Sequence, residues 1–196
     1  MSRADSALPS RLFWRAVRGE AIPFAAWPSV IARAEREGVT PWLAFRHMDM
    51  PERDRWRKRA AAEHLRQQLL VGAVLPLCES AGRPWALVKG LALAHTLYDD
   101  PLARGASDCD ILVLAQDFSL FRKRLLAGGF HQSRDHHEQF IGETGTVDLH
   151  SGFVSTARVP SRARAVLAEP RWEDSLRRVM TPAGEIKTLS ESDTLV

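Results

Sequence analysis

The fold of this chain is decided by the stretch from Trp85 to Val113, which begins WALVKG (85–90) and ends SDCDILV (107–113). The first segment predicts a short buried strand that ends in a glycine turn, and the second predicts a strand that opens with two carboxylates. Residues two apart in a strand point to the same face, so Asp108 and Asp110 should project side by side.

A cation is the usual partner of two neighbouring carboxylates. Like charges this close repel unless positive charge lies between them, and a divalent cation with hard oxygen ligands, commonly Mg²⁺, relieves that repulsion. The segment TVDLH (146–150) predicts another alternating strand, and its Asp148 is placed to reach the same cation. From these residues alone, a metal site of Asp108, Asp110 and Asp148 and a structural role for the same aspartates explain the pattern equally well. Strand-end caps or ion-pair partners are the structural alternative for the three aspartates.

The order of these motifs resembles the uncharacterised nucleotidyltransferase family of the DNA polymerase beta-like superfamily. The resemblance covers roughly residues 85–152, where the motifs follow one another in the family's order. They are Lys89-Gly90, a helix, Arg104, the Ser-Asp-x-Asp strand at 107–110, a second helix, Gly-Phe at 129–130 and Val-Asp-Leu-His at 147–150.

The resemblance implies an α/β or α+β fold, with a nucleotidyltransferase-like mixed sheet flanked by helices. It also implies a metal-dependent enzyme that moves a nucleoside monophosphate from a nucleoside triphosphate to a hydroxyl and releases pyrophosphate. Asp108, Asp110 and Asp148 would be its catalytic and metal-binding residues, with Mg²⁺ or Mn²⁺ as cofactor. The acceptor stays open among a small molecule, a protein and an RNA.

Three further residues are candidates for binding the triphosphate. Gly90 is expected at a helix N-terminus, where free N–H groups and the helix dipole favour phosphate. Lys89 follows an apolar strand directly, so its ammonium should seek an anion. The superfamily usually has Gly-Ser at this turn, whereas this chain has Lys89-Gly90 and lacks the serine hydroxyl. Arg104 is explained equally well as a phosphate contact and as an ordinary loop arginine. His150, on the face of Asp148, is explained equally well as a site residue and as a structural histidine.

An all-helical N-terminal region, residues 1–82, is predicted to precede an α/β core, residues 83–196. Its helical patterns span 10–19, 27–37, 40–50 and 52–80, and the apolar segment 65–77 of the last is expected to be buried. In the core, helices are predicted at 91–98 and 117–127, and strands at 85–90, 107–113, 130–133, 139–142 and 146–150. Beyond residue 160 we expect a short helix at 161–167 and a hairpin of 178–181 with 185–189. Family members continue into further helices here, so a truncated chain and a natively short one are both open.

Composition indicates a soluble globular protein, since hydrophobic residues make up 45% and charged residues 26% of the chain. No apolar run approaches the roughly 20 residues of a bilayer span, and no signal-peptide core follows the N-terminus. Cys78 and Cys109 are expected to be buried free thiols, which favours a cytoplasmic location. Residues 1–68 carry 13 Lys/Arg and 8 Asp/Glu. This excess of five positive charges is small, so we expect solvated helices rather than a duplex DNA partner.

Two functional hypotheses remain open at this level. One is an active nucleotidyltransferase, which the intact set of Asp108, Asp110 and Asp148 favours. The other is a catalytically inactive member of the same fold that binds a nucleotide or a partner protein. The Lys89-Gly90 pair and the abrupt C-terminus favour this second hypothesis.

Overall fold

The structure, a computed structural model, describes residues 3–152 and 172–190 and contains two compact units. The first unit comprises Met1–His64 and Tyr98–Gly105, and the second comprises Leu65–Leu97 and Ala106–Val196. Each unit has its own hydrophobic core. The short helix predicted at 161–167 lies outside the described residues, and the predicted boundary at residue 82 stays a prediction.

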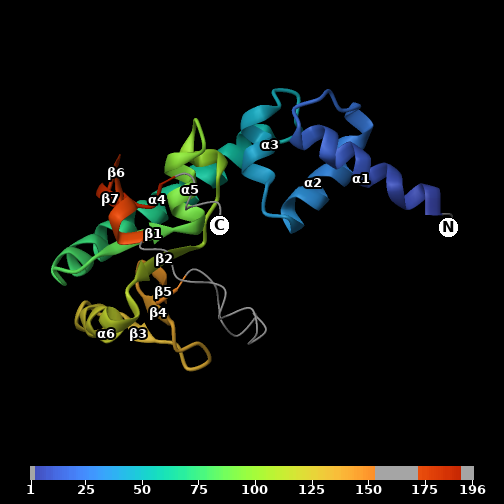
Figure 1. Cartoon of the computed structure of the whole chain (residues 1–196). Coiled ribbons are helices and arrows are strands. Elements are labelled where there is room, and N and C mark those ends of the chain that lie inside the picture. The colour runs from blue at the N-terminus through green and yellow to red at the C-terminus, as the bar shows by residue number, and fades with distance from the viewer. Residues whose placement is uncertain (1–2, 153–171, 191–196) are drawn as a thin grey trace. The chain divides into compact units, whose positions relative to one another are not determined.

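The first unit is helical, as the N-terminal patterns predicted. Its core is made by apolar side chains from three helices, among them the fully buried Trp27 and Leu43. Figure 1 shows these helices in blue. The elements of this unit are α1 (Arg3–Val17), η1 (Phe24–Ala26), α2 (Trp27–Arg36), α3 (Thr40–Arg46), η2 (Pro101–Ala103) and the first part of α4 (Arg53–Glu79).

The helices of the first unit begin and end where the sequence chemistry favours it. Proline occupies the first turn of both α2 and α3, where its missing N–H has no intrahelical partner to lose. Gly19 and Gly38 follow α1 and α2 with φ values of 80° and 69°. Such a left-handed residue closes a helix and is cheapest for glycine.

The second unit is built on a seven-stranded mixed sheet in the order β3-β4-β5-β2-β1-β7-β6. The pairs β2–β5 and β1–β7 are parallel and the other four are antiparallel. This confirms the predicted α/β class with a mixed sheet. The strands are β1 (Trp85–Val88), β2 (Asp108–Val113), β3 (His131–Gln132), β4 (Gln139–Gly142), β5 (Gly145–His150), β6 (Arg177–Thr181) and β7 (Gly184–Thr188).

The two faces of this sheet carry different side chains. One face carries Leu87, Cys109 and Ile111, which pack in one core with apolar residues of α4, α5 (Lys89–Thr96) and α6 (Phe118–Ala127). The opposite face carries a smaller apolar cluster that includes Val88 and Leu112 and is joined by Trp172, Leu189 and Ala86. Two short 3₁₀ turns, η3 (Ala115–Asp117) and η5 (Trp172–Ser175), complete the described elements. Because side chains alternate along β2, Asp110 lies on the second face, as Leu112 does.

The second part of α4 corrects one prediction. Leu70, Val71 and Val74 are buried against the sheet, whereas the side chains of Leu65 and Leu69 are 61% and 59% exposed. The expectation that the whole segment 65–77 is buried was therefore wrong. A helix that packs on one face of a sheet buries only one stripe, and its outer stripe stays in solvent even when it is apolar.

The described helices include no candidate membrane segment. Within residues 3–152 and 172–190, none combines the length and the apolarity that a bilayer crossing requires. The longest helix, α4, runs through Pro76 to Glu79.

Candidate functional site

Strand pairing brings two of the predicted carboxylates directly opposite each other. In the parallel pair of β2 with β5, Asp110 is aligned with Asp148. Aligned residues of neighbouring strands project from the same face, so the two carboxylates leave the sheet together. Leu112 is aligned with His150 in the same register, which places His150 one step further along that face. The predicted alternation of β2 is thus confirmed: Asp110 faces away from the main core that holds Cys109.

A compact group of possible metal ligands results from this alignment. Asp110, Asp148 and His150 each offer one ligand atom, and these atoms all lie within 4.8 Å of one another. In the described part of the chain, no other three acidic, histidine or cysteine side chains converge in this way. Asp110 is only 4% exposed, while Asp148 and His150 are half-buried. His150 was not among the predicted ligands, although its place two residues after Asp148 on an alternating strand was the signal for it.

Two basic groups contact the buried carboxylate. The Nζ atom of Lys89 donates to Oδ1 of Asp110 at 2.6 Å, and Nε2 of His150 lies 2.7 Å from the same oxygen. Burial alone raises the pKa of Asp110, but the hydrogen bonds and positive charges of His150 and Lys89 outweigh it and lower the pKa overall. The anionic form of Asp110 is therefore favoured, and the ammonium of Lys89 is a countercharge in contact with it.

Asp108 lies in a different electrostatic environment. Burial raises the pKa of Asp108, and the negative charges of Asp110 and Asp148 raise it further. A backbone hydrogen bond and the charge of Lys89 lower the pKa and offset only part of this effect. Three carboxylates thus share one face with too little positive charge, and this imbalance is what a divalent cation would relieve.

Asp148 is held by its neighbour on the next strand. Gln139 on β4 is aligned with Asp148 on β5, and its Nε2 donates to Oδ1 of Asp148 at 3.1 Å. A carboxylate carries two oxygens with about four lone-pair sites. The contact therefore fixes the orientation of the carboxylate and leaves further lone pairs for a ligand or a proton.

The turn between β1 and α5 forms the edge of this site. Lys89 has a φ of 55°, a left-handed conformation that costs a non-glycine residue about 1–2 kcal/mol. It follows the buried Val88, which occupies the N-cap position of α5. Valine has no side-chain acceptor, so the N–H groups of the first helical turn, which includes Gly90, are available to an anion. Gly90 therefore lies at a helix N-terminus, as predicted.

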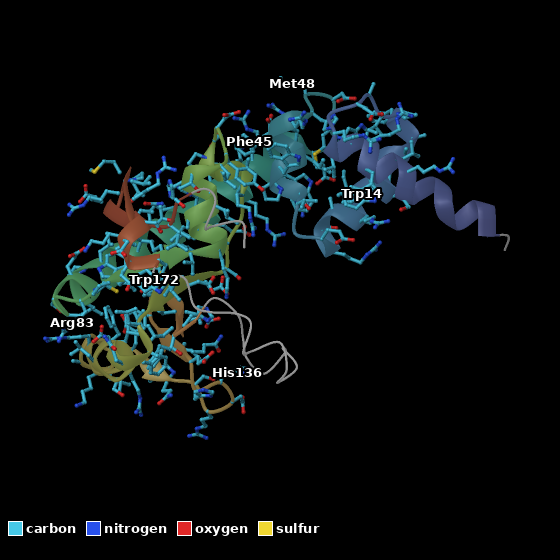
Figure 2. All side chains as sticks on the ribbon, viewed as in Figure 1. Trp14, Phe45, Met48, Arg83, His136 and Trp172 are labelled. Carbon is cyan, nitrogen blue, oxygen red and sulfur yellow. The ribbon has the colours of Figure 1, made fainter. Side chains whose placement is uncertain are left out.

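Arg104, the last predicted site residue, belongs to the first unit, where its guanidinium donates to the carbonyl of Gly105. Its role at a phosphate stays a prediction. His136 and His137 are exposed in the loop between β3 and β4, and Figure 2 labels His136 there. Both thiols face the main core rather than the site: Cys78 and Cys109 are free and buried, as predicted.

The residues of the site fit a divalent cation. Asp110 and Asp148 supply oxygens, the ligands that Mg²⁺ and Mn²⁺ prefer, and His150 supplies a nitrogen that suits a transition metal. The 2.7 Å between Oδ1 of Asp110 and Nε2 of His150 is close to the roughly 3 Å that separates neighbouring ligands of one small cation. Asp108 adds negative charge on the same face.

Comparison with known protein families gives a match. A family model described as an uncharacterised nucleotidyltransferase matches residues 24–196. The matched region contains every candidate site residue named above, from Lys89 to His150. No curated protein and no solved structure matches the chain.

Proposed function

Because the chain belongs to this uncharacterised nucleotidyltransferase family, we propose that it transfers a nucleoside monophosphate from a nucleoside triphosphate to a hydroxyl group. The observation that carries the proposal is the convergence of Asp110, Asp148 and His150 within 4.8 Å on one face of the sheet. Family membership itself agrees with the resemblance that the Asp-x-Asp and Val-Asp-Leu-His segments indicated.

The carboxylates provide the cation site in this proposal. Asp108, Asp110 and Asp148 would hold Mg²⁺ or Mn²⁺, with His150 as an additional ligand. A divalent cation bound there neutralises the phosphate oxygens of the substrate as negative charge builds up on them. Asp108 gains most from it, because burial and the neighbouring carboxylates raise its pKa.

The turn before α5 provides the triphosphate site. The free N–H groups at the start of α5 favour an anion, and Gly90 in that first turn lets the backbone come close to a phosphate. Lys89 lies beside it with a half-exposed side chain, so its ammonium can reach a phosphate oxygen. Arg104 remains a second candidate for such a contact.

Asp148 would receive the proton in the transfer step. The acceptor hydroxyl loses its proton to Asp148 as its oxygen forms a bond with the α-phosphorus. The bond between the α-phosphorus and the oxygen bridging to the β-phosphate breaks, and pyrophosphate leaves with that electron pair. Gln139 donates to Oδ1 of Asp148 and so restrains the orientation of this carboxylate.

A second candidate function rests on one specific contact. Nζ of Lys89 lies 2.6 Å from Oδ1 of Asp110 and can supply permanently the positive charge that a cation would bring. A protein in that state would bind a nucleotide or a partner protein without catalysing transfer. The acceptor, whether a small molecule, a protein or an RNA, follows from neither candidate.

Calorimetric titration with each of the four ribonucleoside triphosphates tests the proposal. We expect binding that requires Mg²⁺ or Mn²⁺ and that Asp110→Asn abolishes. Asp135→Asn is the matched control, since Asp135 is an exposed aspartate of the same unit, and it should bind like the wild type. Release of pyrophosphate with a pool of cellular acceptors then distinguishes the enzyme from the non-catalytic candidate. Absence of binding by the folded wild-type chain would refute the nucleotide site.

A further inference from the structure

The side chain of Lys89 forms a triangle of contacts with two of the possible metal ligands. Its Nζ atom lies 2.6 Å from Oδ1 of Asp110 and 3.0 Å from Nε2 of His150. The third side, between that oxygen and that nitrogen, measures 2.7 Å. Three polar atoms that are so close must share their protons in a defined way.

The chemistry of the three groups limits how these contacts are made. An imidazole nitrogen either donates one hydrogen or accepts one, so Nε2 of His150 cannot at once donate to Asp110 and accept from Lys89. An ammonium has three hydrogens and can donate to both neighbours. When Nε2 of His150 donates to Asp110, Lys89 contacts the carboxylate as a second donor. When Nε2 instead accepts from Lys89, the lone pairs of Asp110 and His150 both face the ammonium. A metal ion would be bound by the same two lone pairs.

The backbone holds Lys89 over the site, while its side chain remains free to leave. Its φ of 55° is unusual for a residue with a Cβ atom, and such conformations persist where the surroundings impose them. The neighbours Val88 and Gly90 are both buried, so the backbone is fixed on either side. The side chain of Lys89 is 55% exposed, against 6% for that of Asp110. The ammonium therefore approaches from the solvent side and can withdraw without any change in the core.

We propose that the ammonium of Lys89 is an internal cation that occupies the Asp110–His150 pair until a divalent cation replaces it. This inference rests on the proposed function and adds to it a coupling between the binding of the cation and the binding of the nucleotide. An ammonium released from the pair remains beside the first turn of α5, where it is free to contact the triphosphate. Lys89 thus changes its partner from a carboxylate to a phosphate as the site fills.

This exchange links the binding of the cation and of the nucleotide. Binding of a divalent cation to Asp110 and His150 frees the ammonium of Lys89 for a phosphate. A bound phosphate in turn draws the ammonium away from these two side chains. Each ligand therefore raises the affinity for the other by the same factor. Substitution of Lys89 should have opposite effects on the two ligands: the cation alone binds more tightly, and the nucleotide binds less tightly.

Binding of Mn²⁺ in the absence of nucleotide tests the first effect. The fraction bound is measured by calorimetry and by loss of the EPR signal of free Mn²⁺, for the wild type and for Lys89→Met. We expect Lys89→Met to bind Mn²⁺ at least about fivefold more tightly, the low end of usual coupling between sites. Lys187→Met is the matched control. This variant removes one positive charge from the same unit, but Lys187 forms an ion pair with Glu79 at 2.8 Å and not with the site. The Mn²⁺ affinity of Lys187→Met should therefore match that of the wild type.

Titration of ATP at saturating Mn²⁺ tests the second effect. The wild type should bind ATP more tightly than Lys89→Met, and the mutual enhancement by Mn²⁺ and ATP should be lost in the variant. Lys89→Gln serves as a second variant if Lys89→Met fails to fold, as judged by circular dichroism. Equal Mn²⁺ affinity in the wild type and the folded variants would overturn the exchange and leave the proposed function intact. Absence of Mn²⁺ binding to every folded protein, Lys89→Met included, would overturn both.

Discussion

Asp110 and Asp148 are aligned residues of two parallel strands, β2 and β5. The relationship places two carboxylates side by side although 37 residues separate them in the chain. Parallel strands need a crossover connection, and here α6, β3 and β4 lie between them in sequence. The site therefore exists only once the sheet has formed, and its properties report on the folded second unit.

Replacement of Asp108 by asparagine should stabilise the cation-free protein at neutral pH. Burial and the nearby carboxylates raise the pKa of Asp108 above the ordinary value of 3.8. A carboxyl group whose pKa is raised on folding stabilises the fold below its unfolded pKa, and that contribution is lost as the pH rises through the folded pKa. Asp108→Asn removes the unfavourable ionised form. We expect a melting temperature higher by about 2 °C at pH 7 in EDTA.

The pH dependence of this effect provides its control. The difference in melting temperature between Asp108→Asn and the wild type should shrink as the pH is lowered and the wild-type carboxyl becomes protonated. Asp135→Asn, in an exposed loop of the same unit, should show no such pH-dependent gain. A lower melting temperature for Asp108→Asn at pH 7 would contradict the electrostatic account.

Substitution of His150 should change the metal preference of the site. His150 is the one nitrogen donor in the group with Asp110 and Asp148, and imidazole favours transition metals over Mg²⁺. We expect His150→Gln to weaken Mn²⁺ binding about tenfold or more, a loss typical of residues around metal sites, and to change Mg²⁺ binding much less. Competition titrations with Mn²⁺ and Mg²⁺ measure the ratio of the two affinities, and His136→Gln in the exposed loop is the control. Equal losses for both ions would argue against a metal–nitrogen bond.

The two thiols should resist alkylation and disulfide reagents in the native protein. Burial raises the pKa of Cys78 to about 12, so that at pH 8 only about one thiol in 10,000 is ionised. Burial also raises the pKa of Cys109 far above its ordinary value. Thiol titration should therefore detect neither cysteine until denaturant is added, and both afterwards. Rapid reaction of one thiol under native conditions would mean that the packing between helix and sheet opens locally.

Position 89 should prefer glycine to alanine, although it lies in the first turn of a helix. With a φ of 55°, any residue with a Cβ atom is strained there. Lys89→Ala and Lys89→Gly both remove the ammonium, so their difference isolates the backbone contribution. We expect Lys89→Gly to be more stable than Lys89→Ala by about 1 kcal/mol in urea denaturation. The reverse order would show that the turn relaxes out of its left-handed conformation.

The local parts of this structure were predictable because they depend on neighbouring residues alone. The period of two in β2 was enough to put Asp108 and Asp110 on the face opposite Ile111, and glycines marked several helix ends. The third carboxylate, Asp148, was a candidate from its own alternating strand, and the resemblance to a family made it a predicted metal ligand. Its alignment with Asp110 depends on sheet order, which a single sequence does not encode locally.

Other features depend on tertiary structure and were not predictable. Nothing in the sequence around Lys89 signals a left-handed backbone, and its contact with Asp110 exists only because β1 and β2 pair with Val88 opposite Asp110. Leu69 and Leu70 are equally hydrophobic, so hydrophobicity does not predict which of the two is buried. One is exposed and the other buried, because the helix turns about 100° between consecutive residues and only one stripe meets the sheet.

The alternation of β2 also limits how this site can change over evolution. Asp110 lies between Cys109 and Ile111, whose side chains belong to the main core. Deletion or insertion of one residue within the strand would reverse the direction of every side chain beyond it, moving carboxylates into the core and apolar groups onto the site. New specificities can therefore arise in β2 by substitution at alternate positions, while changes of length must be confined to the loops on either side of the strand.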